Sequence, residues 1–382
     1  MKKICIFPSD PLKAYFKKGE IKPRYFNPCN FFDEVHILSP CKQDVEEDKV
    51  KAVAGKAKLK IYPIGRFTLF GFFFYRTKVL RLVKKIKPDV IRAYDPLVQG
   101  YLAVYCGKKL KIPTVISIHV DQDEERRFKK FGLFEAIKNY FSRKFVESYS
   151  LRNADKVICV TNFLTSYAKK YGAKIEDIVV IYNRVDTSMF KQRDKNYLFD
   201  KPTILCVGRL DKQKNQACLI KAIKDLDVNL LLVGNGELKN RLQQLAKNLN
   251  LEDRVKFIES VPYSEINKIY SSAYIFAIAS HYEGFCIPVL EAMASSLPVV
   301  APNKEPFPEL IGDAGILVQK NDPRYFQEAF QKLLSNPGIR KKLAKKARKR
   351  AEKFDGKIME RKEMSLYKKI IKNWSESDCK CR

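Results

Sequence analysis

The segment 274–302 constrains the fold of this chain more than any other part of its sequence. Its two continuous apolar runs, YIFAIAS and LPVVAP, are typical of strands that are buried on both faces of a parallel sheet. Between the runs, Pro288 suits the first position of a helix, because proline fixes φ and lacks the N–H that the first turn leaves unused. A strand, a loop, a helix and a second strand in this order predict an α/β domain with a parallel sheet.

Two acids, Glu283 and Glu291, follow the first of these strands. We expect Glu283 in the loop beside Gly284, where glycine lets the backbone approach a ligand, and Glu291 about one turn inside the helix. The free N–H groups at a helix start attract anions, and carboxylates accept hydrogen bonds from hydroxyl groups. Since ligands of open α/β sheets bind at the carboxyl ends of strands, we predict a phosphate site flanked by two acids. The alternative is an ordinary strand–loop–helix with two solvated glutamates.

A second unit of the same kind begins at the apolar run ILCV, which leads into Gly208 and Arg209. Lys214 follows five positions after Arg209, and Lys212 is a nearby alternative. Arginine offers a planar fork of donors and lysine a point charge, and both suit a diphosphate. Apolar runs and helical patterns alternate along the rest of the chain, and 382 residues are enough for two domains of this type.

The segment HYEGFCIPVLEAMASSLPVVAP closely resembles the donor-binding signature of the retaining family-four glycosyltransferases. These enzymes have the GT-B fold, an α/β architecture of two Rossmann-like domains facing a central cleft, with a C-terminal helix that returns to the first domain. The resemblance covers nearly the whole chain and is strongest over 203–323. It implies an N-terminal acceptor-side domain over 1–192, a nucleotide-sugar-binding domain over 200–357, and a final helix over about 358–382. The charged connector 191–202 is the predicted domain boundary.

The resemblance also implies a set of site residues. It assigns catalytic positions to His119 and Glu283, the donor site to Arg209, Lys214, Gly284, Phe285, Cys286 and Glu291, the border of the nucleotide base to Val261 and Pro262, and a loop near the donor phosphates and the acceptor to Gly19.

Three of these positions depart from the family pattern. Cys286 stands where the family commonly has glycine, so a backbone contact survives there only if the position does not need a positive φ. Gly19 lacks the usual second glycine, and a plain surface loop over 9–28 is the alternative interpretation. His119 ends the strand TVISI, where a side chain points into the crevice, but the family's following aspartate is displaced to Asp121. A structural role for His119 is the alternative.

The bulk composition restricts the partners and the compartment. The N-terminus lacks a signal-peptide pattern, no apolar run reaches the length of a membrane span, and the ten cysteines show no metal-type spacing, so we expect a cytoplasmic protein with reduced thiols. The net charge of +30 implies an anionic neighbour. The segments 64–87 and 126–145 interleave basic and aromatic residues, which is typical of helices on an anionic membrane surface, although core aromatics with solvated lysines would look the same.

The function implied by the resemblance is transfer of a sugar from a nucleoside-diphosphate sugar to a glycan or lipid-linked acceptor with retention of configuration, in cell-envelope polysaccharide or glycolipid synthesis. No cofactor and no metal are expected, because basic side chains and N–H groups supply the positive charge at the diphosphate. Asp121 and Asp123 spell a D-x-D motif, but beside His119 and not beside a donor strand. The alternatives are a sugar-nucleotide epimerase or hydrolase, a catalytically inactive sugar-binding protein, and a basic nucleic-acid-binding protein. The last of these lacks a recognised motif, so nucleic acid is not expected as a partner.

Overall fold

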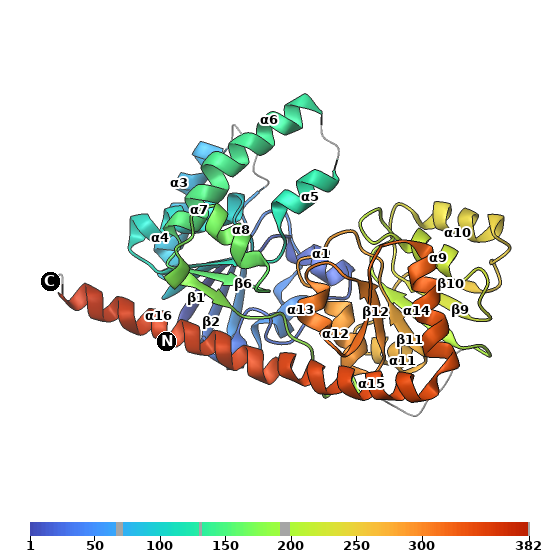
Figure 1. Ribbon diagram of the computed structural model, residues 1–382. Coiled ribbons are helices and arrows are strands. Elements are labelled where there is room, and N and C mark those ends of the chain that lie inside the picture. The colour runs from blue at the N-terminus through green and yellow to red at the C-terminus, as the bar shows by residue number, and fades with distance from the viewer. Residues whose placement is uncertain (66–71, 130–131, 192–198, 381–382) are drawn as a thin grey trace. The chain divides into compact units, whose positions relative to one another are not determined.

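The computed structural model describes residues 1–65, 72–129, 132–191 and 199–380. Its contacts divide the chain into two units (Figure 1), Met1–Tyr182 with Met359–Arg382, and Asn183–Ile358. The division after Tyr182 falls upstream of the predicted connector, most of which lies outside the described residues. Each unit has its own sheet and core and is described separately.

The described residues of the first unit form a seven-stranded parallel sheet in the order β3-β2-β1-β4-β5-β6-β7. Its strands are β1 (Lys3–Phe7), β2 (Glu34–Ser39), β3 (Lys58–Pro63), β4 (Val90–Ala93), β5 (Thr114–Ile118), β6 (Lys156–Cys159) and β7 (Ile178–Val180). Its helices are α1 (Leu12–Lys17), α2 (Glu47–Val50), α3 (Phe72–Ile86), α4 (Val98–Leu110), α5 (Gln122–Phe128), α6 (Leu133–Phe141), α7 (Ser148–Asn153) and α8 (Leu164–Lys170), with a π-helical turn, η3 (Ser142–Glu147), between α6 and α7.

The described residues of the second unit form a six-stranded parallel sheet in the order β10-β9-β8-β11-β12-β13. Its strands are β8 (Thr203–Val207), β9 (Asn229–Val233), β10 (Val255–Ile258), β11 (Ile275–Ala277), β12 (Val299–Pro302) and β13 (Gly315–Val318). Its helices are α9 (Gln216–Ala222), α10 (Lys239–Asn248), α11 (Ile266–Ser271), α12 (Ile287–Ala294), α13 (Phe307–Ile311), α14 (Pro323–Ser335) and α15 (Pro337–Ala351). Both sheets therefore have the strand order of a Rossmann fold, as the sequence predicted.

Apolar residues of the strands build the core on both faces of each sheet. In the first unit Ile4 and Ile6 of β1 belong to a buried cluster that also contains Leu366 and Tyr367 of the last helix, α16 (Gly356–Lys380). The alternate residues of β1, Cys5 and Phe7, are also buried, as expected for a strand covered on both faces. In the second unit, residues of β8, β9 and β11 pack with residues of α9, α10 and α14.

The last helix belongs mainly to the first unit, which holds its residues from Met359 onward. Arg24 donates to both carboxylate oxygens of Glu360 at 3.0 and 3.1 Å, and the indole of Trp374 donates to the carbonyl of Lys111 at 2.9 Å. These contacts tie the last helix to the first unit, as predicted for the C-terminal helix.

The segment 9–28 is not one long loop, because α1 occupies part of it. Gly19 lies just beyond the end of α1 with φ +67°. Its N–H donates to the carbonyl of Phe16, and the N–H of Glu20 donates to the carbonyl of Tyr15. This pair of hydrogen bonds is a Schellman motif, in which a residue with positive φ ends a helix. The interpretation of 9–28 as a loop is wrong over α1, and the need for glycine at position 19 has a local structural cause.

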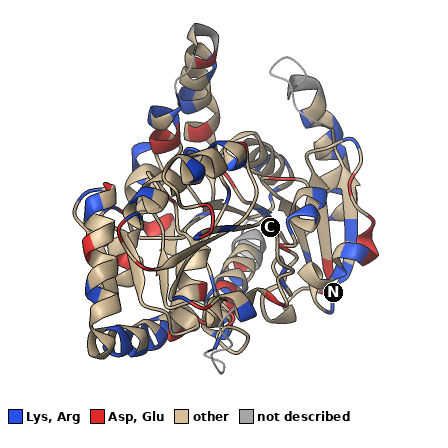
Figure 2. Ribbon diagram, turned by 90° about the vertical axis from the view of Figure 1, so that its right-hand side faces the viewer, with Lys and Arg blue, Asp and Glu red and all other residues tan. Residues whose placement is uncertain are grey.

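None of the helices in the described part of the chain combines the length and the apolar character needed to cross a membrane. Lysine and arginine are spread over many helices of both units (Figure 2), so the net charge of the chain does not come from one segment.

Candidate functional site

The loops that follow β8 and β11 meet at the point where the strand order of the second sheet reverses. β8 pairs with β9 on one side and with β11 on the other. The helices after such a pair lie on opposite faces, so a crevice opens between the two loops at the carboxyl ends of the strands. The first loop carries Gly208, Arg209 and Lys214, and the second carries Glu283, so the fold brings together residues that are far apart in the sequence.

Gln213 ties the two loops together. Its carbonyl accepts from the N–H of His281 at 2.8 Å, and its side-chain amide donates to the carbonyl of Tyr282 at 3.0 Å. The side chain of Gln216 donates to the carbonyl of Arg209 at 2.6 Å and holds the other end of the first loop. The backbone around the predicted donor residues is therefore fixed by hydrogen bonds before any ligand binds.

Lys214 and Glu283 form a largely buried ion pair. The ammonium of Lys214 lies 2.5 Å from Oε1 of Glu283, and the hydroxyl of Ser280 donates to the same oxygen at 2.7 Å. Burial alone would lower the pKa of Lys214, but the adjacent carboxylate outweighs burial and raises the pKa above its usual value. The lysine therefore keeps its positive charge beside Glu283, whereas Lys212 is exposed; the donor-binding role of Lys214 stays a prediction.

Arg209 contrasts with this pair because its side chain is 65% exposed. Its guanidinium lies 3.2 Å from Asp211 and 3.2 Å from the side-chain oxygen of Gln213. An exposed guanidinium with one acidic neighbour is accessible to an anionic ligand.

The backbone of the turn after β9 packs closely against the first loop. The N–H of Leu210 donates to the carbonyl of Asn235 at 3.0 Å, and a Cβ at Gly234 would collide with the carbonyl of Gly208. Gly234 also has φ +144°, which favours glycine. The G-N-G turn after β9 thus packs against the loop after β8.

The helix α12 begins after Cys286, which has φ +73° and ψ +74°. Position 286 therefore adopts the left-handed conformation that suits glycine, and the cysteine holds it at a cost in backbone strain. The expectation that a cysteine keeps the glycine-type backbone only where no positive φ is needed is wrong at this position. Inside the helix, Glu291 is buried and its Oε2 accepts the hydroxyl of Tyr270 at 2.8 Å. Burial and the charge of Glu291 raise the pKa of Tyr270, so this hydroxyl remains a donor.

Val261 and Pro262 lie after β10, at the edge of the sheet away from β11. The carbonyl of Pro262 accepts from the N–H groups of Glu265 and Ile266 at 2.8 and 3.0 Å and so starts α11. Their role at the nucleotide base stays a prediction.

In the first unit, His119 follows β5 and stacks on Tyr94, which follows β4, with ring centroids 5.6 Å apart. Burial, with the charge of Arg92 adding to it, lowers the pKa of His119 to about 3, so the imidazole is neutral. Its Nε2 is buried and has no hydrogen-bond partner among the residues that the structure describes. A buried polar atom without a partner is uncommon and is consistent with a ligand contact.

The cation next to Tyr94 is Arg92. Its guanidinium lies 4.3 Å from the ring of Tyr94, donates to the hydroxyls of Ser117 and Tyr367, and forms an ion pair with Glu363 of α16. The last helix therefore supplies the carboxylate that pairs with this buried guanidinium.

Two family models match the chain: Glycosyltransferase Family 4 over residues 33–189, and Glycosyl transferases group 1 over residues 188–350. The chain belongs to the group 1 glycosyltransferases of family 4. This glycosyltransferase is 26% identical over 329 residues to an uncharacterized glycosyltransferase of Methanocaldococcus jannaschii, covering 84% of this chain and 86% of the relative.

A second relative of the glycosyltransferase is the N-acetylgalactosamine-N,N'-diacetylbacillosaminyl-diphospho-undecaprenol 4-alpha-N-acetylgalactosaminyltransferase of Campylobacter jejuni. The two are 33% identical over 232 residues, covering 57% of this chain and 62% of the relative. Among solved structures, HepE of Anabaena in complex with UDP has a TM-score of 0.77 and 18% identity, covering 97% of this chain and 100% of that one. With the two parallel sheets, this likeness confirms the predicted GT-B fold.

In this glycosyltransferase the two aspartates of the D-x-D motif have other partners. Asp121 caps α5 by accepting from the N–H groups of Asp123 and Glu124. Asp123 is buried and pairs with Lys170 at 2.6 Å, with further contacts to Arg143 and Tyr171. The described residues contain no cluster of three or more metal-binding side chains.

Sequence reasoning missed four residues that hold the site of the glycosyltransferase together, namely Gln213, Gln216, Tyr270 and Ser280. Glutamine, serine and tyrosine carry no distinctive spacing. Only their position one to three residues from a predicted site residue could have indicated Gln213, Gln216 and Ser280. Tyr270 had no such signal.

Proposed function

We propose that this glycosyltransferase moves a sugar from a nucleoside-diphosphate sugar to a glycan or lipid-linked acceptor, with retention of the anomeric configuration. The observation that carries the proposal is the Lys214–Glu283 pair at the switch point of the second sheet, with Arg209 exposed beside it. A diphosphate requires cations, and a sugar ring requires a carboxylate that accepts from its hydroxyls. Both kinds of group stand here on neighbouring loops.

The names of the relatives support the donor and the acceptor. The HepE structures contain UDP or UDP-glucose, and the Campylobacter jejuni relative is named for a diphospho-undecaprenol substrate. We therefore propose a uridine nucleotide sugar as the first donor to test and a lipid-linked glycan as the first acceptor.

In the proposed reaction, the bond between the anomeric carbon and the diphosphate oxygen breaks, and the acceptor oxygen forms the new bond on the same face of the sugar. The acceptor proton passes to the departing diphosphate. Arg209, Lys214 and the N–H groups of Gly284, Phe285 and Cys286 stabilise the negative charge that grows on the leaving group, so no metal is required. Glu283 orients the sugar hydroxyls and Glu291 binds the ribose.

His119 is proposed to contact the transferred sugar as a neutral hydrogen-bonding group. Its depressed pKa keeps the imidazole uncharged at neutral pH, and its buried Nε2 lacks a partner among the described residues. A neutral imidazole polarises a hydroxyl without adding a second positive charge. We also propose that Gly19 belongs to the loop that approaches the acceptor and the donor phosphates.

A panel of nucleotides and nucleotide sugars tests the donor site. A ligand at 100 times its dissociation constant stabilises a protein by about 2.7 kcal/mol, which a thermal-shift assay detects. We expect a shift with a nucleoside diphosphate and sugar transfer that continues in excess EDTA. Activity that is lost with EDTA and restored by Mg²⁺ or Mn²⁺ would contradict the metal-free diphosphate site.

The same site could serve an epimerase or hydrolase, since those reactions also begin with a bound nucleotide sugar. Such an enzyme would consume the donor without an added acceptor. We expect donor turnover to depend on acceptor, and rapid acceptor-free turnover would favour the alternative.

The proposed location is the cytoplasmic face of an anionic membrane, where a lipid-linked acceptor is available. The basic helix α3 supports this location, because its described residues contain no acid and its lysine and arginine side chains Lys78, Arg81, Lys84 and Lys85 are exposed.

A further inference from the structure

The helix α6 and the turn η3 expose a group of large apolar side chains. Ile137, Tyr140, Phe141 and Phe145 are 48%, 57%, 49% and 53% exposed. Their spacing of three and four residues places them on one face of the helical segment. Most large hydrophobic residues of a folded protein are buried, and a contiguous exposed group marks an interaction surface.

The aromatic side chains of this face contact one another and a lysine. The rings of Phe141 and Phe145 stack at 5.7 Å, and the ring of Tyr140 meets that of Phe141 edge-on at 6.0 Å. The ammonium of Lys144 lies 5.7 Å from the rings of both Tyr140 and Phe145. An apolar face with a cation at its rim is typical of a helix in a membrane interface.

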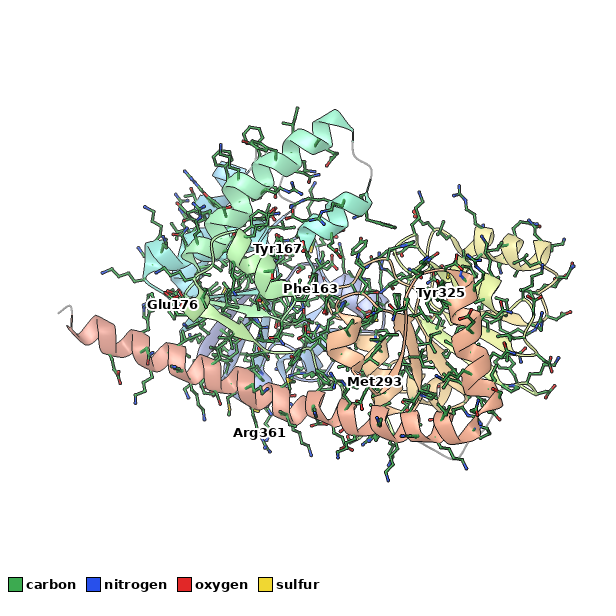
Figure 3. All side chains as sticks on the ribbon, in the orientation of Figure 1. Phe163, Tyr167, Glu176, Met293, Tyr325 and Arg361 are labelled. Atoms are coloured by element: carbon green, nitrogen blue, oxygen red, sulfur yellow. The ribbon has the colours of Figure 1, made fainter. Side chains whose placement is uncertain are left out.

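The segment is held firmly on its other side. Glu147 of η3 is fully buried and accepts hydrogen bonds from Arg126 of α5, Tyr167 of α8 and Ser142. Figure 3 shows Tyr167 on α8 beneath α6, and side chains of α6 projecting outward at the edge of the first unit. The apolar face is therefore presented by an anchored element, which reduces the entropy lost when it binds.

The charges near this face favour an anionic partner. The helix α4 contacts both α3 and η3, so the basic helix α3 and the apolar face belong to the same side of the first unit (Figure 1). The acid Glu135 of α6 is paired with Lys138 at 3.4 Å, whereas the described part of α3 has basic residues and no acid. A protein partner would need both a large apolar contact and a separate acidic surface, whereas an anionic bilayer supplies both at once.

We propose that Ile137, Tyr140, Phe141 and Phe145 insert into the interface of an anionic membrane while α3 lies over its head groups. This inference rests on the peripheral location proposed above, and it does not depend on which sugar is transferred. It divides the binding into an apolar part, carried by α6 and η3, and an electrostatic part, carried by α3.

Co-sedimentation of the full chain with vesicles tests the proposal. We expect binding to phosphatidylcholine vesicles containing about one third phosphatidylglycerol, and weaker binding to pure phosphatidylcholine or at high salt. Phe141→Ser/Phe145→Ser should weaken binding to the anionic vesicles about tenfold or more, since each half-exposed ring loses apolar burial.

Matched variants test whether membrane binding depends on this face or on any exposed apolar side chain. Ile137→Ser should weaken binding, whereas Ile175→Ser should not, although Ile175 is 70% exposed in the same unit. Lys78→Glu/Lys85→Glu on α3 should weaken binding mainly at low salt. This charge-reversal variant also tests the proposal if the phenylalanine variant fails to fold.

Three results would overturn the proposal: no binding of the wild-type protein to anionic vesicles, equal binding of the α6 and Ile175 variants, or a concentration-dependent dimer that Phe141→Ser/Phe145→Ser abolishes. The last result would mean that this apolar face mediates contact between two copies of the chain. The thermal shift by a nucleoside diphosphate, measured on the same proteins, distinguishes a failure of this inference from a failure of the proposed donor site.

Discussion

The two Rossmann-like sheets have the same strand order, yet the loops at the carboxyl ends of their strands hold opposite kinds of chemistry. In the second unit the loops after β8 and β11 bring Lys214, Glu283 and Arg209 together, and Arg209 remains exposed. In the first unit the loops after β4 and β5 bring two neutral rings together, Tyr94 and His119. The cation behind them, Arg92, is buried and paired with Glu363.

The difference between the two sites shows that strand order determines which loops are neighbours, whereas side chains determine the charge there. By strand order, β8 pairs with β11 in the second sheet, and β4 pairs with β5 in the first. The accessible charge at each site depends on local partners. In the first unit Arg92 is buried and paired with Glu363 of α16, whereas in the second unit Arg209 stays exposed beside Asp211. An anionic ligand is therefore expected at the second unit, and a neutral one at the first.

The first prediction concerns the buried ion pair between Arg92 and Glu363 in the first unit. Glu363→Ala leaves Arg92 buried without its carboxylate, so the free energy of unfolding should fall by about 3 kcal/mol, the lower end for a broken buried ion pair. Ser117, Tyr367 and Tyr94 continue to contact the guanidinium, which is why we expect the lower end. Urea unfolding measures the change.

Lys362→Ala is the matched control, because this neighbour on α16 is exposed and should change stability by less than about 0.5 kcal/mol. Equal stability of the Glu363 and Lys362 variants would mean that the ion pair does not neutralise Arg92 as described.

The second prediction removes the exposed charge of the second unit. Arg209→Ala should lower kcat about 10²-fold or more, because a preorganised cation stabilises the leaving group most in the transition state. The melting temperature should stay near the wild-type value, since the side chain is mostly exposed. Steady-state kinetics with donor and acceptor measure the loss.

Lys212→Ala is the control for this site: it removes an exposed cation of the same loop and should leave kcat within about twofold. A larger effect of Lys212→Ala than of Arg209→Ala would reverse the proposed assignment.

The fold could be predicted well from the sequence because buried parallel strands are continuous apolar runs, and such runs need no knowledge of distant partners. The helix α1 was missed for the opposite reason: its single short amphipathic turn lies among lysines and prolines. The meeting of Glu283 and Lys214 could be predicted in outline, since both belong to motifs with recognisable spacing, and their role at the donor stays a prediction.

The supporting contacts could not be predicted. Arg92 and Glu363 lie in elements that only the return of α16 brings together, and neither has a local motif. The pairing of Lys214 with Glu283 also required the side-chain positions. The conformation at Cys286 also required the structure, because a cysteine does not by itself indicate a positive φ.

The third prediction concerns the neutral imidazole of the first unit. Between pH 7 and pH 5 an unfolded histidine takes up a proton, but His119, with its pKa near 3, does not. The unfolded state binds more protons, so acidification destabilises the wild-type protein, by about 2 kcal/mol from this residue over that range.

His119→Asn should reduce the pH dependence by that amount, as measured by urea unfolding at both pH values. His36 and His281 titrate in both proteins and cancel in the comparison. An unchanged pH slope in the variant would show that His119 is not held neutral by its surroundings.

The fourth prediction tests uniform binding in the second unit. Glu291 is proposed to contact ribose, which is the same in substrate and transition state, so Glu291→Gln should raise the donor KM about tenfold with little change in kcat. Tyr270→Phe, which removes the hydroxyl that donates to Glu291, should raise KM in the same direction by less. A fall in kcat without a change in KM would place Glu291 at the reacting sugar.

The last prediction concerns the smallest effect, the backbone strain at Cys286. A residue with a Cβ in the left-handed region costs about 1 kcal/mol relative to glycine, and this position has φ +73°. Cys286→Gly relieves that strain but loses a buried thiol and gains freedom in the unfolded chain, so its stability should lie within about 1 kcal/mol of wild type. Cys286→Ala loses the thiol and keeps the strain, so it should be less stable than the glycine variant by about 1 kcal/mol. Thermal unfolding of the two variants measures the difference, and donor turnover should persist in the glycine variant because its N–H keeps its direction. An alanine variant as stable as the glycine variant would mean that the loop of the second unit is not strained, and the sites of the two units would then differ in charge alone.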